Sequence, residues 1–243
     1  AYVAKKGKPI ALSTGAANLD EIRAAVKAIV RAGNDQIILL HCVLAYPAPL
    51  AHANLRMMSH LGEEFPEFPV GFSDHTPGIA ADVAAALLGA AFIEKHFTHT
   101  PGPAAGARKV GESPDHDIGI GPEQFREMVR AIREDEREGR SVRLGLTGEE
   151  AIENLKRGPH PEVLGSFAAK QVDEAVELKA RLQARRSVVA EAFLRKGTRI
   201  TREMIERGDL VCKRPGTGIP PYELEMLVGK TVQEDIHPDT VLR

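Results

Sequence analysis

Cysteines, long apolar runs and an excess of charge of one sign are all scarce in this sequence. Two cysteines, Cys42 and Cys212, are too few for a disulfide framework, and neither belongs to a paired metal-binding motif. No apolar run approaches the roughly 20 residues that span a bilayer, and the opening AYVAKKGKP lacks the apolar core of a signal peptide. The net charge is −2 with scattered Lys and Arg, which argues against nucleic-acid binding. We therefore expect a cytoplasmic protein without membrane or nucleic-acid partners.

Strand-length apolar runs alternate with helical patterns in the first part of the chain. The runs are Ile10–Ser13, Ile37–His41, Val70–Ser73 and Phe92–His96, and the helices are Leu19–Arg31, about Ala53–Glu64, Pro77–Leu88 and Pro122 to about Glu138. Such repeats predict an α/β fold with parallel strands, either a doubly wound sheet or part of a (β/α) barrel. No GxGxxG motif follows the first strand, so the barrel is favoured.

The composition and the apolar pattern of the sequence change at residue 141 and again at residue 185. Residues 141–184 have the surface-like composition of a linker, with a charged helix from Ala168 to Ala184. Residues 185–243 are short apolar snippets separated by turn signals, which predicts a small β-rich module. We expect a partial TIM-barrel domain at residues 1–140, a linker at 141–184 and the β-rich module at 185–243.

Two polar segments end neighbouring strands, namely Ser73-Asp74-His75-Thr76 and Glu94-Lys95-His96-Phe97. Because side chains alternate along a strand, Ser73 and His75 share one face, and so do Glu94 and His96. If these faces point into a barrel, the two imidazoles meet at its mouth and could bind Mn²⁺, Mg²⁺, Co²⁺ or Zn²⁺. Glu94 could then bind substrate or transfer a proton. The alternative is that both histidines are hydrogen-bonded polar groups at strand ends.

Other candidate residues lie in loops, and each has a structural alternative. Cys42 ends a strand and suits a small buried residue, whereas Tyr46 could line a pocket or pack its loop. Asp115 lies in a long loop rich in Gly and Pro and could bind a sugar hydroxyl or form a solvated turn. Arg214 precedes a Pro-Gly turn, where it could bind a carboxylate or phosphate or be a plain surface residue.

The order of several segments resembles the sialic acid synthase family. The matching stretches include KPIALSTG, LLHCVLAYPAP, VGFSDHT, GAAFIEKHFT, RRSVVA and KRPGTGI. The resemblance implies a TIM barrel followed by an antifreeze-like, or SAF, domain in a domain-swapped homodimer. It implies an enzyme that condenses phosphoenolpyruvate with an N-acetylated hexosamine such as N-acetylmannosamine and releases phosphate. The implied cofactor is a divalent metal, commonly Mn²⁺, with Mg²⁺ or Co²⁺ as alternatives.

The resemblance also assigns roles to individual residues. The metal ligands are His75 and His96, and the active-site carboxylate is Glu94. The implied substrate-binding residues are Ser13 and Ser73 near the phosphate, Tyr46 and Asp115 near the sugar, and Arg214, which reaches into the neighbouring subunit's site.

Two departures from the family pattern affect these expectations. Val43 and Leu44 replace the polar pair that many members carry beside the phosphate, which leaves two alternatives: the phosphate is held by other groups, or the substrate differs. Only four strands precede the predicted linker, whereas a (β/α)₈ barrel needs eight strands and about 250 residues. We therefore expect the chain to be a fragment that is inactive alone. A metal-dependent hydrolase and a non-catalytic relative with a structural or glycan-binding role are the alternatives.

Overall fold

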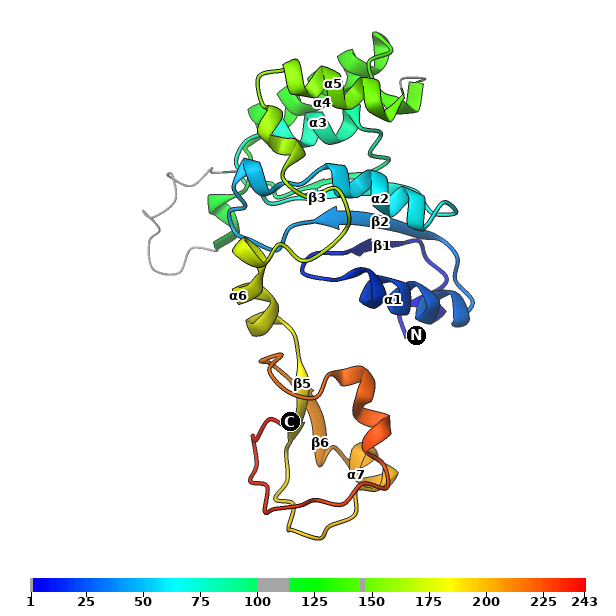
Figure 1. Cartoon of the computed structure of the whole chain (residues 1–243), viewed down its shortest axis with the longest axis vertical. Coiled ribbons are helices and arrows are strands. Elements are labelled where there is room, and N and C mark those ends of the chain that lie inside the picture. Colours follow the sequence, from blue (N-terminus) through cyan, green and yellow to red (C-terminus); the bar gives the residue numbers. More distant parts are fainter. Residues whose placement is uncertain (1, 100–113, 145–146) are drawn as a thin grey trace. The chain divides into compact units, whose positions relative to one another are not determined.

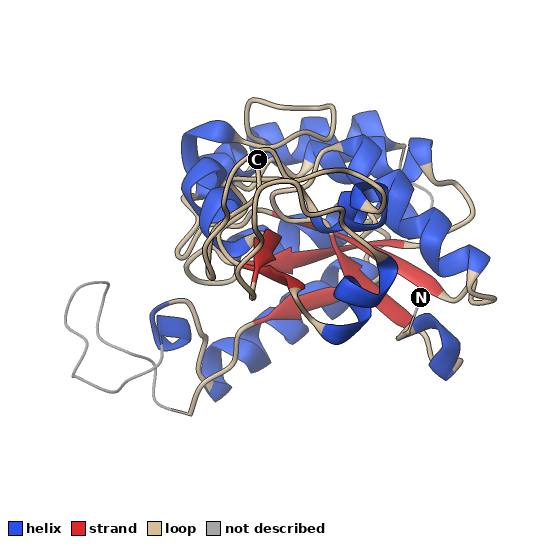
Figure 2. Cartoon of the chain, turned by 90° about the horizontal axis from the view of Figure 1, so that it is seen from below, coloured by secondary structure: helices blue, strands red, loops and turns tan. Residues whose placement is uncertain are grey.

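The computed structural model describes residues 2–99, 114–144 and 147–243, and the chain divides into two compact units. The first unit is Ala1–Glu177 and the second is Leu178–Arg243. Figure 2 shows helices, strands and loops along the chain. Each unit has its own hydrophobic core, so each is described separately.

The centre of the first unit is a parallel sheet of four strands in the order β1-β2-β3-β4. The strands are β1 (Ile10–Ser13), β2 (Ile37–Cys42), β3 (Val70–Asp74) and β4 (Ile93–Lys95). Each predicted strand is confirmed to within one residue at either end, and so is the α/β class. That the sheet is half of an eight-stranded barrel stays a prediction.

Helices α1 (Leu19–Arg31), α2 (Arg56–Glu64), α3 (Ala80–Leu87) and α4 (Pro122–Arg137) follow the four strands in turn. The predicted start of α1 is confirmed, since the side chain of Asn18 accepts from Glu21 N and the Glu21 side chain accepts from Asn18 N. The predicted start of α3 is wrong by three residues. Gly78 has φ +74°, which no helix contains, so Pro77 lies in the preceding loop.

Side-chain alternation divides the sheet into an outer face that packs on helices and an inner face. Leu39 and Ile37 of β2 pack with α1 and α2, and Phe72 of β3 packs with α2 and α3. The intervening residues belong to the inner face, where Ser13 and Glu94 are exposed and Phe92 retains 41% of its accessible surface. The residues with candidate chemistry therefore stand on the inner face, at the carboxyl ends of the strands.

The segment that we interpreted as a linker contributes to the core of the first unit. Helix α5 (Gly148–Arg157) and the 3₁₀ turn at Pro161–Leu164 bury Ala151, Leu155 and Val163 against α2, α3 and Phe72. Helix α6 (Glu174–Ala184) is shorter than the predicted charged helix and begins in the first unit. The segment has a surface-like composition because α5 buries only Ala151 and Leu155, and the one buried residue of α6 is the charged Glu177.

Gly165 fixes the path of this segment, which gives a first prediction. Its φ of +64° and ψ of −174° lie in a region that essentially only glycine adopts, and an added Cβ would lie 2.1 Å from Asn54 Oδ1. We expect Gly165→Ala to lower the free energy of unfolding by at least about 3 kcal/mol. Gly139→Ala is the control, because φ is +69° there but nothing lies within 4 Å, so about 1 kcal/mol is expected. Equal losses in urea unfolding would contradict the steric argument.

The second unit is built around strands β5 (Ser187–Ala190) and β6 (Leu210–Lys213), which pair antiparallel. Helix α7 (Arg202–Arg207) lies between them in the sequence, and its N-cap Thr201 accepts from Met204 N. Isolated bridges such as Leu194↔Ile236 and Arg199↔Thr231 extend the pairing. The core contains Val188, Leu194, Ile200, Leu210, Val232 and Leu242.

Among the described helices, none is both long enough and apolar enough to cross a membrane.

Candidate functional site

The two predicted histidines converge on the inner face of the sheet. His75 follows β3 and His96 follows β4, and their ring centroids are 5.3 Å apart at an interplanar angle of 60°. The β3–β4 ladder pairs Asp74 with Lys95, so the histidines are the next residues beyond its last pair. Because side chains alternate along both neighbouring strands, the two imidazoles lie next to each other on the same face of the sheet, as expected.

Hydrogen bonding determines which nitrogen of His75 is available. Its Nδ1 lies 2.9 Å from the carbonyl oxygen of Val43, an acceptor, so Nδ1 carries the proton and Nε2 keeps a lone pair. Burial lowers the pKa of His75, with the neighbouring His96 acting in the same direction, so the ring is neutral at neutral pH. A neutral imidazole with a free Nε2 is the form that ligates metals.

Small polar groups and one carboxylate accompany the histidines. Ser73 is buried and its hydroxyl donates to Glu94 Oε1 at 2.7 Å, while the rest of Glu94 is exposed on the inner face. Cys42 lies beside them, with Sγ 3.7 Å from His75 Nδ1. Burial raises the pKa of the Cys42 thiol, so it is not a thiolate ligand at neutral pH. Ser13 lies at the exposed end of β1, the strand next to β2.

Tyr46 covers the histidines from the loop after β2. Its ring centroid is 4.2 Å from that of His75 and 6.2 Å from that of His96, and about half of the residue remains exposed. Partial burial raises the pKa of its phenol, and the Asp115 carboxylate contributes to the same direction, so the hydroxyl stays protonated. The aromatic ring, the two imidazoles and Glu94 form one cluster, in which His75 is buried, His96 is half-buried and Glu94 is exposed. Asp115 is exposed nearby in a 3₁₀ turn at Pro114–Asp117, after the predicted long loop, most of which lies outside the described residues.

The histidine pair supplies two protein ligands for a metal and not three. Within the described part of the chain, no group of three His, Cys, Asp or Glu side chains is arranged to hold a metal ion. The pair fits a metal with several coordination positions left for water or substrate oxygens. Such a site would bind its metal reversibly rather than as a closed structural centre.

Arg214 belongs to the second unit, at an exposed position directly after β6. The peptide bond between Arg214 and Pro215 is cis, and Ser187 Oγ donates to the carbonyl of Pro215. Its predicted role in a partner's site stays a prediction.

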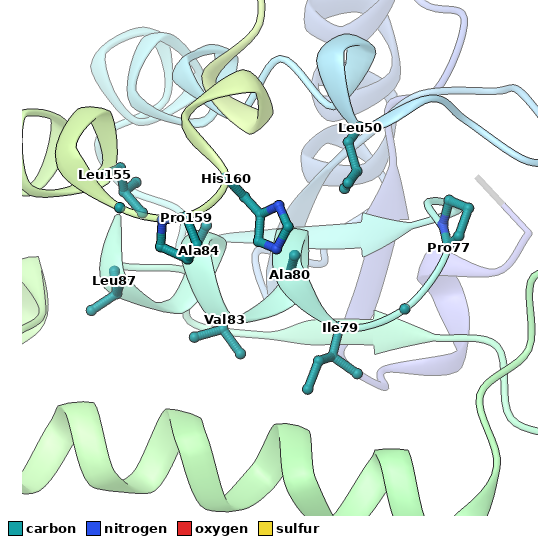
Figure 3. A pocket seen from close by; sticks show the side chains of 12 residues that line it. Leu50, Pro77, Ile79, Ala80, Val83, Ala84, Leu87, Leu155, Pro159 and His160 are labelled. Carbon is teal, nitrogen blue, oxygen red and sulfur yellow. The ribbon is translucent and has the colours of Figure 1, made fainter.

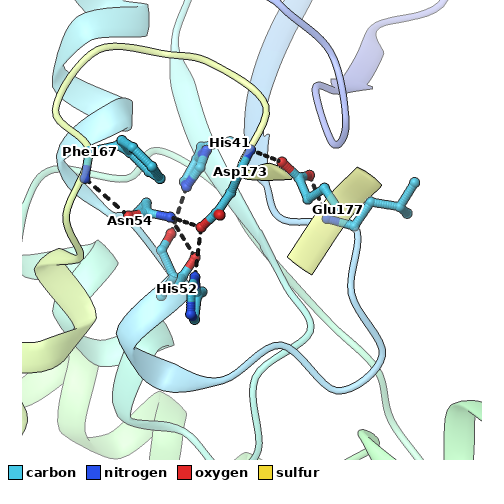
Figure 4. Close-up of polar contacts among 8 residues, drawn as sticks. His41, His52, Asn54, Phe167, Asp173 and Glu177 are labelled. Atoms are coloured by element: carbon cyan, nitrogen blue, oxygen red, sulfur yellow. Dashed lines mark hydrogen bonds and ion pairs between the residues drawn. The ribbon is translucent and has the colours of Figure 1, made fainter. Parts of the chain in front are cut away.

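A buried carboxylate that the sequence did not reveal joins the strand-end loops. Glu177 Oε1 accepts from Ala16 N at 2.7 Å and from Leu44 N at 2.8 Å, and Oε2 accepts from Asp173 N. Asp173 in turn accepts from His52 Nδ1 and Asn54 Nδ2 (Figure 4). The start of α6 therefore fixes the loops after β1 and β2, which border the histidine pair. No pattern around Glu177 marks it, because Ala16 and Leu44, the loop residues that it holds, lie more than 100 residues away in the sequence.

His41, on the outer face of β2, gives a pH prediction. Its Nε2 donates to Ala53 O at 2.7 Å, and burial, reinforced by the Lys170 charge, lowers its pKa to about 3. The unfolded chain protonates near pH 6.5, so it binds more protons than the folded chain below that pH. The contribution of the neutral His41 to the free energy of unfolding is therefore fully present above pH 6.5 and is lost as the pH falls towards 3.

We expect His41 to account for a loss of about 2–3 kcal/mol in the free energy of unfolding between pH 7 and pH 4.5. His41→Gln keeps an amide that can donate to Ala53 O but cannot be protonated, so its loss over this range should be smaller by that amount. Urea unfolding of both proteins at the two pH values measures the difference. Parallel losses would show that other groups cause the acid sensitivity.

An apolar cavity of about 460 Å³ lies away from the histidine pair, between α3 and the end of α5 (Figure 3). His160 is the one titratable residue in its described lining, which is otherwise formed by residues such as Leu50, Ile79, Val83, Leu87 and Leu155. This lining offers no carboxylate or second imidazole, so the polar chemistry belongs to the strand ends.

A parallel sheet with helices on its outer face and polar residues at the carboxyl ends of its strands is the arrangement of α/β enzymes that bind substrates at this edge. The chain belongs to the NeuB family, whose model matches residues 1–141. A SAF domain matches residues 185–243. The resemblance predicted from the sequence is thereby confirmed.

Relatives with known names share moderate identity along nearly the whole chain. N,N'-diacetyllegionaminic acid synthase of Legionella pneumophila is 34% identical over 245 residues, which are 99% of this chain and 57% of that protein. Human N-acetylneuraminate-9-phosphate synthase is 32% identical over 98% of this chain and 56% of its own length. The crystal structure of the Bacillus subtilis spore coat polysaccharide biosynthesis protein SpsE superposes with a TM-score of 0.75 at 32% identity, covering 100% of this chain and 62% of that one.

The chain thus spans a little under 60% of the length of these two curated relatives. Both curated relatives are named as synthases, one of N,N'-diacetyllegionaminic acid and the other of N-acetylneuraminate 9-phosphate.

Proposed function

We propose that the protein containing this chain condenses phosphoenolpyruvate and one water molecule with an N-acetylated hexosamine aldehyde, N-acetylmannosamine or a relative, to give a nonulosonic acid and phosphate; C3 of phosphoenolpyruvate bonds to the aldehyde carbon, and water adds at C2 as phosphate leaves. The observation that carries the proposal is the pair of imidazoles 5.3 Å apart beside Glu94, in a chain of the NeuB family. The names of the Legionella and human relatives supply the product class.

In this proposal, His75 and His96 hold a divalent metal, Mn²⁺ foremost and Mg²⁺ or Co²⁺ as alternatives. The bond from His75 Nδ1–H to Val43 O keeps Nε2 directed away from the backbone and available. A bound metal would supply Lewis-acid polarisation of the aldehyde oxygen. With two protein ligands, the remaining positions are open to that oxygen and to water.

The other residues orient the substrates. Glu94, held by the hydroxyl of Ser73, is placed to accept a hydrogen bond or a proton beside the aldehyde. Tyr46 packs against His75 and offers an aromatic face to the sugar, and Asp115 is close enough to influence the Tyr46 phenol. Ser13 is the proposed hydroxyl donor for the phosphate, and Ser73 is a second one once substrate binding turns its single O–H away from Glu94.

The departure at Val43-Leu44 has a structural counterpart. The amide of Leu44 donates to Glu177, and the carbonyl of Val43 accepts from His75. Both apolar residues thus use their backbone to hold the loop and the metal ligand. We propose that phosphate is bound mainly by groups outside these four strands, because no Lys or Arg occupies their inner-face positions.

The proposal extends to assembly. A domain-swapped homodimer, in which Arg214 reaches the neighbouring subunit's site, would provide a cation for the substrate carboxylate or phosphate. The support is the matched SAF domain and the exposed position of Arg214.

The test uses this chain fused behind the N-terminal half-barrel of the Legionella relative, here called the joined protein. We expect phosphate release that requires phosphoenolpyruvate, an N-acetylated hexosamine and Mn²⁺, with EDTA abolishing it. Mass spectrometry of the product identifies the sugar acid and compares candidate hexosamines. A folded joined protein that binds Mn²⁺ yet forms no product with any of them would favour the non-catalytic alternative.

A further inference from the structure

Lys95 is a buried lysine on the face of the sheet opposite to His96. Its side chain is 1% exposed, and lysines are almost never so buried without a partner. Its Nζ lies 2.5 Å from Asp74 Oδ2, 2.6 Å from the carbonyl oxygen of Thr76 and 3.5 Å from Asp82 Oδ2. The proposed reaction uses none of these four groups.

These contacts bracket His75. Lys95 donates to Asp74, which precedes His75, and to Thr76, which follows it. Asp74 also accepts from the amide of Thr76 at 2.8 Å and from its hydroxyl at 3.0 Å. The chain on both sides of His75 is therefore tied to one ammonium group.

The same lysine directly precedes His96. The regular β3–β4 ladder ends at the pair Asp74–Lys95, so backbone pairing does not extend to the histidines. The hydrogen bond from Lys95 to Thr76 O crosses from β4 to β3 beyond that point. On its other side, His96 is held by Ile120, whose amide donates to its carbonyl oxygen.

Asp82 of α3 completes the cluster with an unusual carboxyl group. Neither of its oxygens has a hydrogen-bond partner among the described residues, and the side chain is fully buried. Burial and the neighbouring Asp74 raise the pKa of Asp82 to about 8. Asp74 and Lys95 form a buried ion pair, and the raised pKa of Asp82 favours the uncharged form of its carboxyl, which limits the net charge that the cluster buries.

We propose that Lys95, which lies on the opposite face of the sheet, is a positioning residue that sets the distance between the two imidazoles. It thereby sets the affinity of the histidine pair for a metal. This inference rests on the proposed metal site. Groups that orient metal ligands without touching the metal typically change affinity by about 10- to 100-fold when they are removed.

The test titrates Co²⁺ into the 243-residue chain and follows visible absorption. Lys95→Met removes the ammonium group, and Lys95→Met/Asp74→Asn also replaces the carboxylate of Asp74, its partner in the ion pair, with a neutral amide that can still accept from Thr76. The double variant is included because removing only one partner of a buried ion pair leaves an uncompensated charge, whereas removing both partners does not. We expect both variants to bind Co²⁺ about 10- to 100-fold more weakly, with an altered spectrum.

Two further measurements separate positioning from general destabilisation. Leu61→Ala removes fully buried core volume against α1 and should destabilise the fold while leaving Co²⁺ affinity within about twofold. Hydrogen exchange of the Thr76 and Ile120 amides, which donate to Asp74 Oδ1 and to the carbonyl of His96, is measured without metal and should accelerate in the Lys95 variants and not in Leu61→Ala.

The outcomes distinguish this inference from the function on which it rests. If the wild-type chain binds Co²⁺ and the double variant binds it equally well, the positioning role is overturned and the proposed metal site stands. If the wild-type chain binds no Co²⁺, the metal assignment fails. Exchange at the Thr76 and Ile120 amides then still decides whether Lys95 holds the strand ends together.

Discussion

His75→Ala in the joined protein should lower the rate of phosphate release by at least about 10³-fold. Lewis-acid polarisation by a bound metal contributes several kcal/mol to such reactions, and each 1.4 kcal/mol is a tenfold change in rate. Removing one of two protein ligands leaves His96 alone, which cannot retain the metal against water. His96→Ala should have the same effect, and the double variant should be no worse than either single variant, because the two rings act as one site.

Metal binding provides the independent measurement for the histidine variants. Each single variant should lose Mn²⁺ binding in electron paramagnetic resonance titrations while its circular dichroism spectrum stays unchanged. His160→Ala is the matched control, since this half-exposed histidine lies in the lining of the apolar cavity and pairs with Glu162. A His75 variant that keeps more than a tenth of the wild-type rate would remove the basis of the proposed mechanism.

The chain by itself should release no phosphate above background, whereas the joined protein should. The inner face of the sheet is open, with Phe92 41% exposed and Ser13 and Glu94 exposed at the strand ends. In the described part of the chain, β1 and β4 are edge strands of the sheet. An open face cannot exclude water from the reacting groups.

Electrostatics give the same expectation. Phosphoenolpyruvate is an anion, and the inner-face positions of these strands include Glu94 but no Lys or Arg. Each preorganised donor to developing charge increases the rate by about 10²–10³-fold. Because several such donors are absent from these strands, we expect turnover by the chain alone to be below detection. Joined protein carrying His75→Ala is the control that attributes activity to this chain's site. Turnover by the isolated chain within tenfold of the joined protein would contradict the expectation.

Local sequence patterns correctly predicted most of the first unit. The four strands of the sheet were located to within one residue, because short apolar runs with Gly, Pro or Asn at one end or both specify a strand locally. The capping box at Asn18 likewise needs only its own turn. The convergence of His75 and His96 followed from two local facts, strand alternation and the adjacency of consecutive parallel strands.

Contacts between distant segments could not be predicted in this way. Glu177 looks like a surface residue of a charged helix, yet it is buried against amides 161 and 133 residues away. The segment at 148–164 has a linker's composition, but its few apolar residues fill a gap beside α3. The glycine at 165 reveals its role only once Asn54 is found beside its Cα.

The sequence by itself determined the α/β class, the family and the pair of histidines, since each depends on short patterns read within one strand or helix. The tertiary structure alone decided which buried charges support that pair, namely Glu177 behind the loops and Lys95 behind the strands. The physical reason is that a charged side chain is buried only where partners from other segments pair with it. Which distant segments come into contact cannot be predicted from a local sequence pattern.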